Sequence, residues 1–448
     1  MDSKEDTHEI KCPYIATINR RLLDFDKEQI CSVTLAKNNI YGCLVCGRYF
    51  QGKGRTTPLY NHCLDEAHYV CVNLKTASIY WIPEDVELTD ESLYDIKQNL
   101  LPKYDATYIK NIEKISKECK VDLNGNKYYP GFIGFKNIKN TEYFNVLIQA
   151  FVHLPKFFQH YLQYNKLDNT TTDSLFVTAI STITKRIWNQ HSFKTFIDQT
   201  ESVNLLSVVS HGKFSLESKG NIVDFLNFFM NFNKRHNELI DSFFTGVVEV
   251  ENFKLIKEIG GRNEGEGEKI KTIDGIEYLY NKKRSHFLYL TLDLPKKPLF
   301  KNSQEKITIP VVELRDLMDK YRGVFYVELP ELGVKRLYKV KKFPRYLILV
   351  FNRLDVNKYI IEKNNTIVHF HLNNLTLEEC ENKEVKFNLL CNIVFEGENE
   401  KDDSYKVQIL NKGRNEWFEI KNNEVKKILS DNVLLSECYI LFYEKIKQ

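Results

Sequence analysis

The sequence lacks any long hydrophobic run, and no stretch approaches the roughly 18 consecutive apolar residues that a membrane-spanning helix needs. Its first ten residues, MDSKEDTHEI, contain no apolar segment like that of a secretory signal. A strong excess of one charge is also missing, because 63 basic and 60 acidic side chains give a formal net charge of +3. We therefore expect neither a membrane protein nor a dense stripe of basic residues for binding phosphates.

The 448 residues are 43% hydrophobic, which is too apolar for a disordered protein and points to about two or three folded domains. The composition changes near residue 103. A Cys/His-rich segment precedes this point, and a lysine-rich stretch with Ile109, Ile112 and Ile115 at helical spacing follows it. The sequence predicts an N-terminal domain over residues 1–103, a linker helix and turn over 104–128, and a large domain over 129–448.

The large domain begins with helical periodicity and continues with strand-like segments. One helix is marked by Phe144 to Phe151 and should end or kink at Pro155, and a second runs from Val223 to Phe232. Helices followed by strands predict an α+β fold. Later segments rich in aromatic or β-branched residues are Phe287–Leu294, Gly323–Leu329, Tyr346–Leu354, Phe387–Phe395, Tyr405–Leu410 and Tyr439–Tyr443.

Two polar segments of this domain are interpreted as loops. Residues 260–268, GGRNEGEGE, have little apolar content and are expected to be mobile. The cluster Lys282-Lys283-Arg284 could contact a phosphate or act as an import signal, although a solvated loop is the preferred interpretation. The aromatic residues sit at core spacing and lack an interleaved basic face, so direct RNA binding is the weakest hypothesis considered.

Six of the ten cysteines lie in the first 71 residues, which indicates metal binding more than disulfide bonding. Cys43 and Cys46 form a CxxC pair, and His62 and His68 follow in the spacing C-x2-C-x15-H-x5-H. Two thiolates and two imidazoles satisfy tetrahedral zinc and leave no position for water, as in structural sites. Cys63 and Cys71 lie close enough in the sequence to compete as ligands. Cys12 and Cys31 are interpreted as small core residues.

Residues 12 to about 103 resemble the UBP-type zinc finger of ubiquitin-specific proteases. The resemblance rests on Cys12-Pro13-Tyr14, Cys43-Leu44-Val45-Cys46-Gly47, the two histidines and the apolar Val70–Leu74. It favours Cys43, Cys46, His62 and His68 as the ligands of one structural zinc ion. Members with three zinc ions place a histidine and a cysteine where this sequence has Pro58 and Gln51. Members that bind the ubiquitin tail use an arginine where Lys53 stands, and lysine lacks the bidentate fork.

The chain from Gly131 onward resembles the protease body of the same family, a papain-like fold with thumb, palm and fingers. Residues 134–145, GFKNIKNTEYFN, resemble the cysteine box, and Asp224-Phe225-Leu226 resembles the EFL motif. The segments Phe343–Leu349 and Asn352-Arg353-Leu354 resemble a conserved strand of the body. The segments Trp417–Ile420 and Tyr439–Tyr443 resemble its closing strands.

The resemblance also implies a degenerate active site. Glu142 stands at the cysteine position, Ser404 at the histidine position, and Asn422 at the orienting position. The family reaction needs a thiolate and an imidazole base, so we expect no catalytic residues, no enzyme activity and no bound cofactor besides zinc. A carboxylate in the first turn of a helix is favoured by the helix dipole, which explains how Glu142 can replace the thiol.

The combination of this finger with such a body resembles the inactive ubiquitin-specific-protease-like splicing factors of the U4/U6·U5 tri-snRNP. That resemblance implies a non-catalytic nuclear scaffold in pre-mRNA splicing, which contacts tri-snRNP proteins and associates with RNA indirectly. Two alternatives remain open. One is an adaptor that binds ubiquitin, and the other is a residual cysteine protease that uses a different thiol, such as Cys391 or Cys438.

Overall fold

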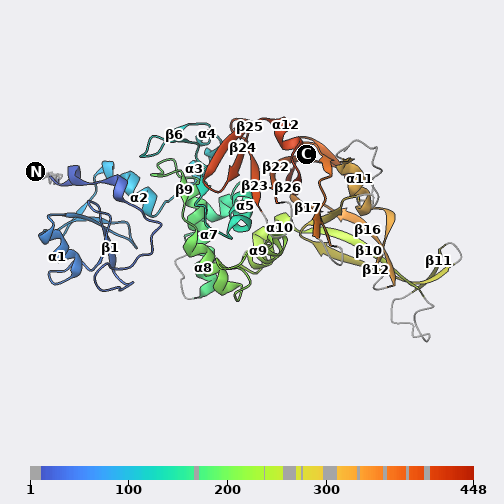
Figure 1. Cartoon of the computed structure of the whole chain (residues 1–448), viewed down its shortest axis with the longest axis horizontal. Helices are drawn as coiled ribbons and strands as arrows, with labels where there is room; N and C mark the ends of the chain where they lie inside the picture. Colours follow the sequence, from blue (N-terminus) through green and yellow to red (C-terminus); the bar gives the residue numbers. More distant parts are fainter. Residues whose placement is uncertain are drawn as a thin grey trace, which may run out of the picture. The chain divides into compact units, whose positions relative to one another are not determined.

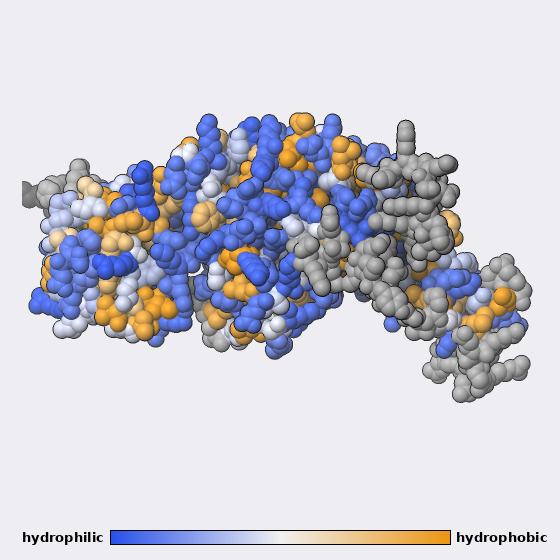
Figure 2. All heavy atoms as spheres, viewed as in Figure 1, coloured by the Kyte–Doolittle hydropathy of each residue, from blue (hydrophilic) through white to orange (hydrophobic). Residues whose placement is uncertain are grey.

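The computed structural model describes residues 12–165, 171–236, 238–255, 269–273, 276–295, 310–329, 333–356, 361–379, 383–397 and 404–447. The chain forms two compact units. The first, which we call the N-terminal unit, combines the chain up to Lys136 with Gln159–Val209. The second combines Asn137–Phe158 with Ser210–Gln448, and we call it the cleft unit because it contains the cavity beside Glu142 that is described below. Within the described residues, no helix is long and apolar enough to cross a membrane. Figure 2 shows polar side chains over much of the visible surface of each unit, interrupted by small apolar patches.

The N-terminal unit begins with a small sheet and one helix, which we call the N-terminal module (Figure 1). The sheet has the order β2-β1-β3-β4-β5. Its core includes Cys12 and Cys31, as predicted, with Leu44, Val72 and Ile79. The elements are β1 Ile40–Cys43, β2 Tyr49–Gln51, α1 Pro58–Asp65, β3 Val70–Asn73, β4 Ile79–Trp81 and β5 Val86–Leu88.

The remainder of the N-terminal unit is mainly helical. The predicted linker helix is two short helices, α3 and α4. The turn predicted within 104–128 lies at Asn124-Gly125-Asn126, between the paired strands β6 and β7. The elements are α2 Tyr94–Leu100, α3 Ala106–Lys110, α4 Ile112–Ile115, β6 Lys120–Val121, β7 Lys127–Tyr128, β8 Gly134–Phe135, α7 Thr172–Ile187, β9 Phe196–Ile197 and α8 Thr200–Val209.

Two acidic side chains of the N-terminal module are bound by cations of the helical part of the same unit. Asp26, which is nearly buried, pairs with Arg186 of α7 and with Lys194, at 2.6 Å from the latter. Lys194 also lies 2.7 Å from Asp24. These ion pairs connect the module to α7 and to the segment before β9.

The cleft unit is built on a sheet of eight strands, ordered β13-β17-β26-β22-β23-β24-β25 with β21 paired to β22 (Figure 1). Helices α5 and α9 pack together, and α5 also contacts β22 and β23. The strands are β13 Leu290–Asp293, β17 Tyr346–Asn352, β21 Leu375–Glu379, β22 Lys383–Phe395, β23 Tyr405–Asn411, β24 Glu416–Lys421, β25 Glu424–Ile428 and β26 Cys438–Lys445. The helices are α5 Glu142–Phe151, α9 Ile222–His236, α10 Glu238–Phe244, α11 Leu314–Met318 and α12 Ser430–Leu434.

A second sheet of this unit has longer strands in the order β11-β12-β10-β16-β15, and we call it the long-strand sheet. Val248 and Val340 on one of its faces join the apolar core of the unit. Its strands are β10 Gly246–Leu255, β11 Lys269–Ile273, β12 Ile276–Phe287, β15 Arg322–Leu329 and β16 Val334–Lys342. The remaining described strands form the pairs β14 Val311–Glu313 with β20 Ile367–His369 and β18 Leu354–Val356 with β19 Ile361–Lys363.

The α+β class and the predicted helices and strands of the body are confirmed, with three corrections. Pro155 begins helix α6, Pro155–Gln163, because proline suits the first helical turn, where its missing N–H costs no bond. The predicted strand Phe287–Leu294 is divided between β12 and β13. The cluster Lys282-Lys283-Arg284 lies within β12, so its interpretation as a loop was wrong. The expected mobile loop at residues 260–268 lies outside the described residues.

Candidate functional site

The CxxC pair lies at the end of β1, in a tight knuckle. The Gly47 N–H donates a hydrogen bond to the Cys43 carbonyl at 2.9 Å, which closes the turn. Gly47 has a φ of 72°, and a side chain there would place a Cβ atom 2.2 Å from the Leu22 carbonyl oxygen. Only glycine fits this position, and the turn directs both thiols to the same side.

The two histidines come from α1 and from the segment between α1 and β3. His62 is buried and its ring stacks on Phe50, with ring centroids 4.2 Å apart. His62 Nε2 lies 3.5 Å from Cys46 Sγ and 3.3 Å from His68 Nδ1. One ligand atom from each of Cys43, Cys46, His62 and His68 lies within 4.8 Å of the others. The structure therefore brings together the four side chains that the spacing predicted.

These separations fit a tetrahedral zinc ion. With bonds of about 2.0 Å to nitrogen and about 2.3 Å to sulfur, tetrahedral angles separate two nitrogens by roughly 3.3 Å and a nitrogen from a sulfur by roughly 3.5 Å. The two distances at His62 match these values. Cys43, Cys46, His62 and His68 would hold the ion, whose chemistry is structural because all four positions are filled by protein.

The two competing cysteines lie outside this group. Cys63 is fully buried beside Leu59 and Phe50 in an apolar cluster. The Cys71 thiol, also fully buried, faces the Tyr80 carbonyl oxygen at 3.8 Å. Both side chains therefore serve the core of the module, and neither belongs to the group of candidate metal ligands found among the described residues.

Lys53 is already occupied by partners within the module. Its Nζ lies 2.5 Å from Asp85 Oδ1 and 3.9 Å from the centroid of the Tyr80 ring. Partial burial lowers the pKa of Lys53, but the Asp85 carboxylate outweighs this effect and holds the pKa above its ordinary value. A ligand carboxylate would have to compete with Asp85 for this charge.

Glu142 is the first residue of α5, where the family resemblance places the nucleophile. One of its carboxylate oxygens accepts a hydrogen bond from the Tyr405 N–H at 3.2 Å. Ser404, at the position of the base, is half-buried and its carbonyl accepts a bond from the Glu396 N–H at 2.8 Å. The Glu142 carboxylate is thus bound to Tyr405, the residue that follows the histidine position and begins β23.

Three asparagine side chains near Glu142 are joined by hydrogen bonds. Asn145 donates from Nδ2 to Asn422 Oδ1 at 3.1 Å, and Asn422 donates in turn to Asn137 Oδ1 at 3.3 Å. Asn422 therefore has partners, although it has no imidazole to orient. The sequence analysis missed the role of Asn145, because the bond joins residues 277 positions apart.

A cavity of about 320 Å³ remains beside Glu142. It is lined by Asn137, Lys139, Asn140, Glu142, Tyr143, Lys219, Gly220 and Tyr405. None of these residues offers a thiol or an imidazole, so the lining holds neither a sulfur nucleophile nor a histidine base.

The two cysteines considered as replacement nucleophiles are sealed in the core. Cys391 and Cys438 are fully buried, and burial raises the pKa of both thiols. Cys391 faces the Ala150 carbonyl at 3.7 Å, and Cys438 contacts the Arg353 guanidinium at 3.7 Å. Among the residues that the structure describes, no hydrogen bond joins either thiol to a histidine.

Comparison with known proteins agrees with this architecture. Residues 133–443 match the family "Ubiquitin carboxyl-terminal hydrolase", and residues 31–93 match "Zn-finger in ubiquitin-hydrolases and other protein". The chain belongs to the ubiquitin carboxyl-terminal hydrolase family. The match to the finger family implies zinc binding by the N-terminal module.

Three similar proteins cover nearly the whole chain. Human "Ubiquitin carboxyl-terminal hydrolase 39" is 32% identical over 98% of this chain and 81% of its own length. "Probable mRNA-splicing protein ubp10" of Schizosaccharomyces pombe is 33% identical over 96% of this chain and 88% of its own. A solved structure described as an essential yeast splicing factor has a TM-score of 0.76 at 25% identity, and the match covers 97% of this chain and 100% of that one. The expected fold, a UBP-type finger followed by a ubiquitin-specific-protease body, is confirmed.

Proposed function

We propose that this protein is a non-catalytic scaffold of pre-mRNA splicing that acts in the nucleus through contacts with proteins of the U4/U6·U5 tri-snRNP. The observation that carries the proposal is the cavity at Glu142, whose lining has neither cysteine nor histidine. The fold of a hydrolase is present, but the described residues that line this cavity include no thiol to attack an amide and no imidazole to protonate the leaving amine. Relatives of similar length that are named as splicing proteins support the same role.

The proposal includes one structural zinc ion, held by Cys43, Cys46, His62 and His68 in the N-terminal module. It also keeps the three predicted regions, 1–103, 104–128 and 129–448. The ion pairs of Asp24 and Asp26 with Arg186 and Lys194 suggest that the first region is held against the helical part of the N-terminal unit. The finger would then keep a fixed position relative to helix α7 and would not move independently on a flexible linker.

The test is affinity purification of the full chain from nuclear extract, followed by sequencing of RNA and identification of proteins. The proposal predicts that U4, U5 and U6 small nuclear RNAs are recovered together with tri-snRNP proteins. Recovery of ubiquitin-modified proteins without these RNAs would contradict it and favour a ubiquitin-binding adaptor. The variant Lys53→Ala should leave the recovered set unchanged, because Asp85 already occupies the Lys53 ammonium.

A further inference from the structure

The long-strand sheet gathers basic side chains on one face, which we call the basic face. Cross-strand partners in antiparallel strands point to the same side of a sheet. The register places Arg284 and Lys339 on either side of Glu249. Every second residue along each of these strands therefore points to the same face as these three side chains. The cations of the basic face on β11, β12 and β16 are Lys271, Lys282, Arg284, Lys335, Lys339 and Lys341.

Three carboxylates share this face, so the six named cations outnumber them by three. Arg322 of β15 lies opposite Lys339 on the same face, but it pairs with Asp319 and Glu378. Glu249 is bound by Lys282 at 2.8 Å and Lys341 at 3.2 Å. Glu251 lies 3.5 Å from Lys282, and Glu328 lies 2.9 Å from Lys335. Among the described residues, no carboxylate lies within ion-pair distance of Arg284, Lys339 or Lys271, and these three are exposed.

Aromatic rings lie among the same cations, so the expectation from the sequence that the aromatic residues lack an interleaved basic face was wrong for this sheet. Phe253 of β10 is flanked by Tyr280 of β12, with ring centroids 5.2 Å apart, and by Tyr326 of β15 at 5.4 Å. The Lys271 ammonium lies 5.3 Å from the Phe253 ring and 5.1 Å from the Tyr280 ring. Tyr326 is 43% exposed on the edge strand, so its ring is open to a stacking partner.

We propose that the basic face binds single-stranded RNA. Uncompensated cations attract the phosphate backbone, and an exposed ring such as that of Tyr326 can stack on a base without requiring a particular sequence, whereas the Phe253 ring is fully buried. Val248 and Val340 point to the opposite face and join the apolar core, which leaves the basic face turned away from that core. The exposed Tyr326 ring favours RNA over an acidic protein surface, which would need the charges alone.

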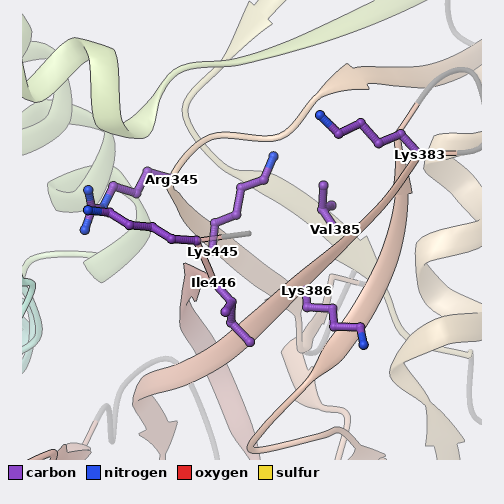
Figure 3. A pocket seen from close by; sticks show the side chains of 7 residues that line it. Arg345, Lys383, Val385, Lys386, Lys445 and Ile446 are labelled. Carbon is purple, nitrogen blue, oxygen red and sulfur yellow. The ribbon is translucent and has the colours of Figure 1, made fainter.

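The chain has a second basic hollow that lacks this combination. Figure 3 shows Arg345, Lys383, Lys386 and Lys445 among the side chains that line this pocket. The pocket, which we call the notch, has a volume of about 240 Å³. Its remaining lining residues are Val385, Ile446 and Lys447, so no aromatic ring lines it. Arg345 and Lys445 are also paired with Glu444 and Glu379. The notch offers charge without stacking, which makes Lys383 and Lys386 a matched control for the basic face.

The experiment measures fluorescence anisotropy of a labelled 12-nucleotide oligouridine with the full-length protein over a range of salt concentrations. The variant with Arg284→Gln and Lys339→Gln should weaken binding and flatten the slope of log affinity against log salt by about 1.4, because each phosphate contact on a single strand contributes roughly 0.7. The control with Lys383→Gln and Lys386→Gln removes the same charge and should bind like the unchanged protein. Tyr326→Ala should weaken binding about fivefold or more, and Tyr326→Phe should preserve it.

Three results would overturn the inference. First, the unchanged protein could fail to bind the oligouridine at about 50 mM salt, a concentration at which phosphate contacts are only weakly screened. The two double variants could lose affinity equally, which would indicate an effect of net charge only. Tyr326→Ala could bind RNA normally while polyglutamate displaces the RNA, which would assign the face to an acidic protein. The inference goes beyond the splicing proposal and is separable from it, since recovery of small nuclear RNAs through protein contacts does not require this face.

Discussion

The metal-type cluster of the N-terminal module and the cavity at Glu142 lie in regions that match two different families, and they differ in which functional side chains are present. In the module, all four metal-binding side chains are present at separations that fit zinc. In the cleft, helix α5 and strand β23 still meet, but Glu142 bonds to Tyr405 where the family resemblance places a thiolate and an imidazole. A structural site cannot lose its ligands without losing the fold, whereas a catalytic site can lose its reacting groups and keep its backbone.

The largest effect is expected from Cys46→Ser. Loss of one thiolate should remove the zinc ion and unfold the N-terminal module, because structural zinc contributes on the order of 10 kcal/mol to folding. Metal analysis should change from one zinc per chain to none, and the Trp81 fluorescence of the module should lose its unfolding transition. Cys63→Ser is the matched control, since Cys63 is adjacent to His62 but outside the ligand group, and it should retain zinc. A stoichiometry of three zinc ions would contradict the assignment.

In the cleft unit, the next largest loss of stability is expected from substitution of a buried arginine. Arg353 is fully buried and donates to the carbonyls of Cys438, Asn364 and Thr366. Arg353→Met should destabilise the unit by about 3–5 kcal/mol, because three buried carbonyls lose their donor.

Chemical denaturation followed by Trp417 fluorescence would measure the effect of Arg353→Met. Arg322→Met is the control, because Arg322 is 43% exposed and its surface pairs with Asp319 and Glu378 contribute about 1 kcal/mol or less. Equal losses of unfolding free energy in the two variants would show that the buried hydrogen bonds of Arg353 stabilise the unit no more than a surface ion pair does.

A smaller loss is expected where the N-terminal module meets α7. Asp26→Asn keeps the size of the side chain but removes the charge that Arg186 and Lys194 share. The N-terminal unit should lose about 2 kcal/mol of unfolding free energy, measured through Trp188. Glu28→Gln alters an exposed pair with Lys37 and should leave the transition where it is. If Asp26→Asn also had no effect, the ion pairs would not hold the module against α7.

The last prediction is a pH dependence within the same unit. Burial, with a smaller contribution from the Lys103 charge, lowers the pKa of Lys185 to about 8. The folded state therefore releases this proton more readily than the unfolded state, so stability should rise with pH between about 8 and about 10.5. Lys185→Met should remove this contribution, and the difference between the two stability curves should shrink as the pH rises. Parallel curves over this range would contradict the assignment.

Local patterns predicted much of this structure. The CxxC spacing and the two histidines fall within 26 residues, and the apolar periodicity of α5, α9, β17 and β26 is evident in the sequence. Contacts between distant residues were not accessible in the same way. The bond from Asn145 to Asn422 and the charges of the basic face depend on strand register, which composition does not reveal. Strands β10, β12 and β16 are polar on one face, so they lack the apolar runs that identified the other strands.

Turnover of a fluorogenic ubiquitin substrate tests the proposed absence of catalysis most directly. Neither the unchanged protein nor Glu142→Cys should release the fluorophore above the buffer rate, because the cavity offers no imidazole to activate a thiol. An active member of the family in the same assay provides the reference. Measurable turnover by either form of this protein would contradict the proposed loss of function.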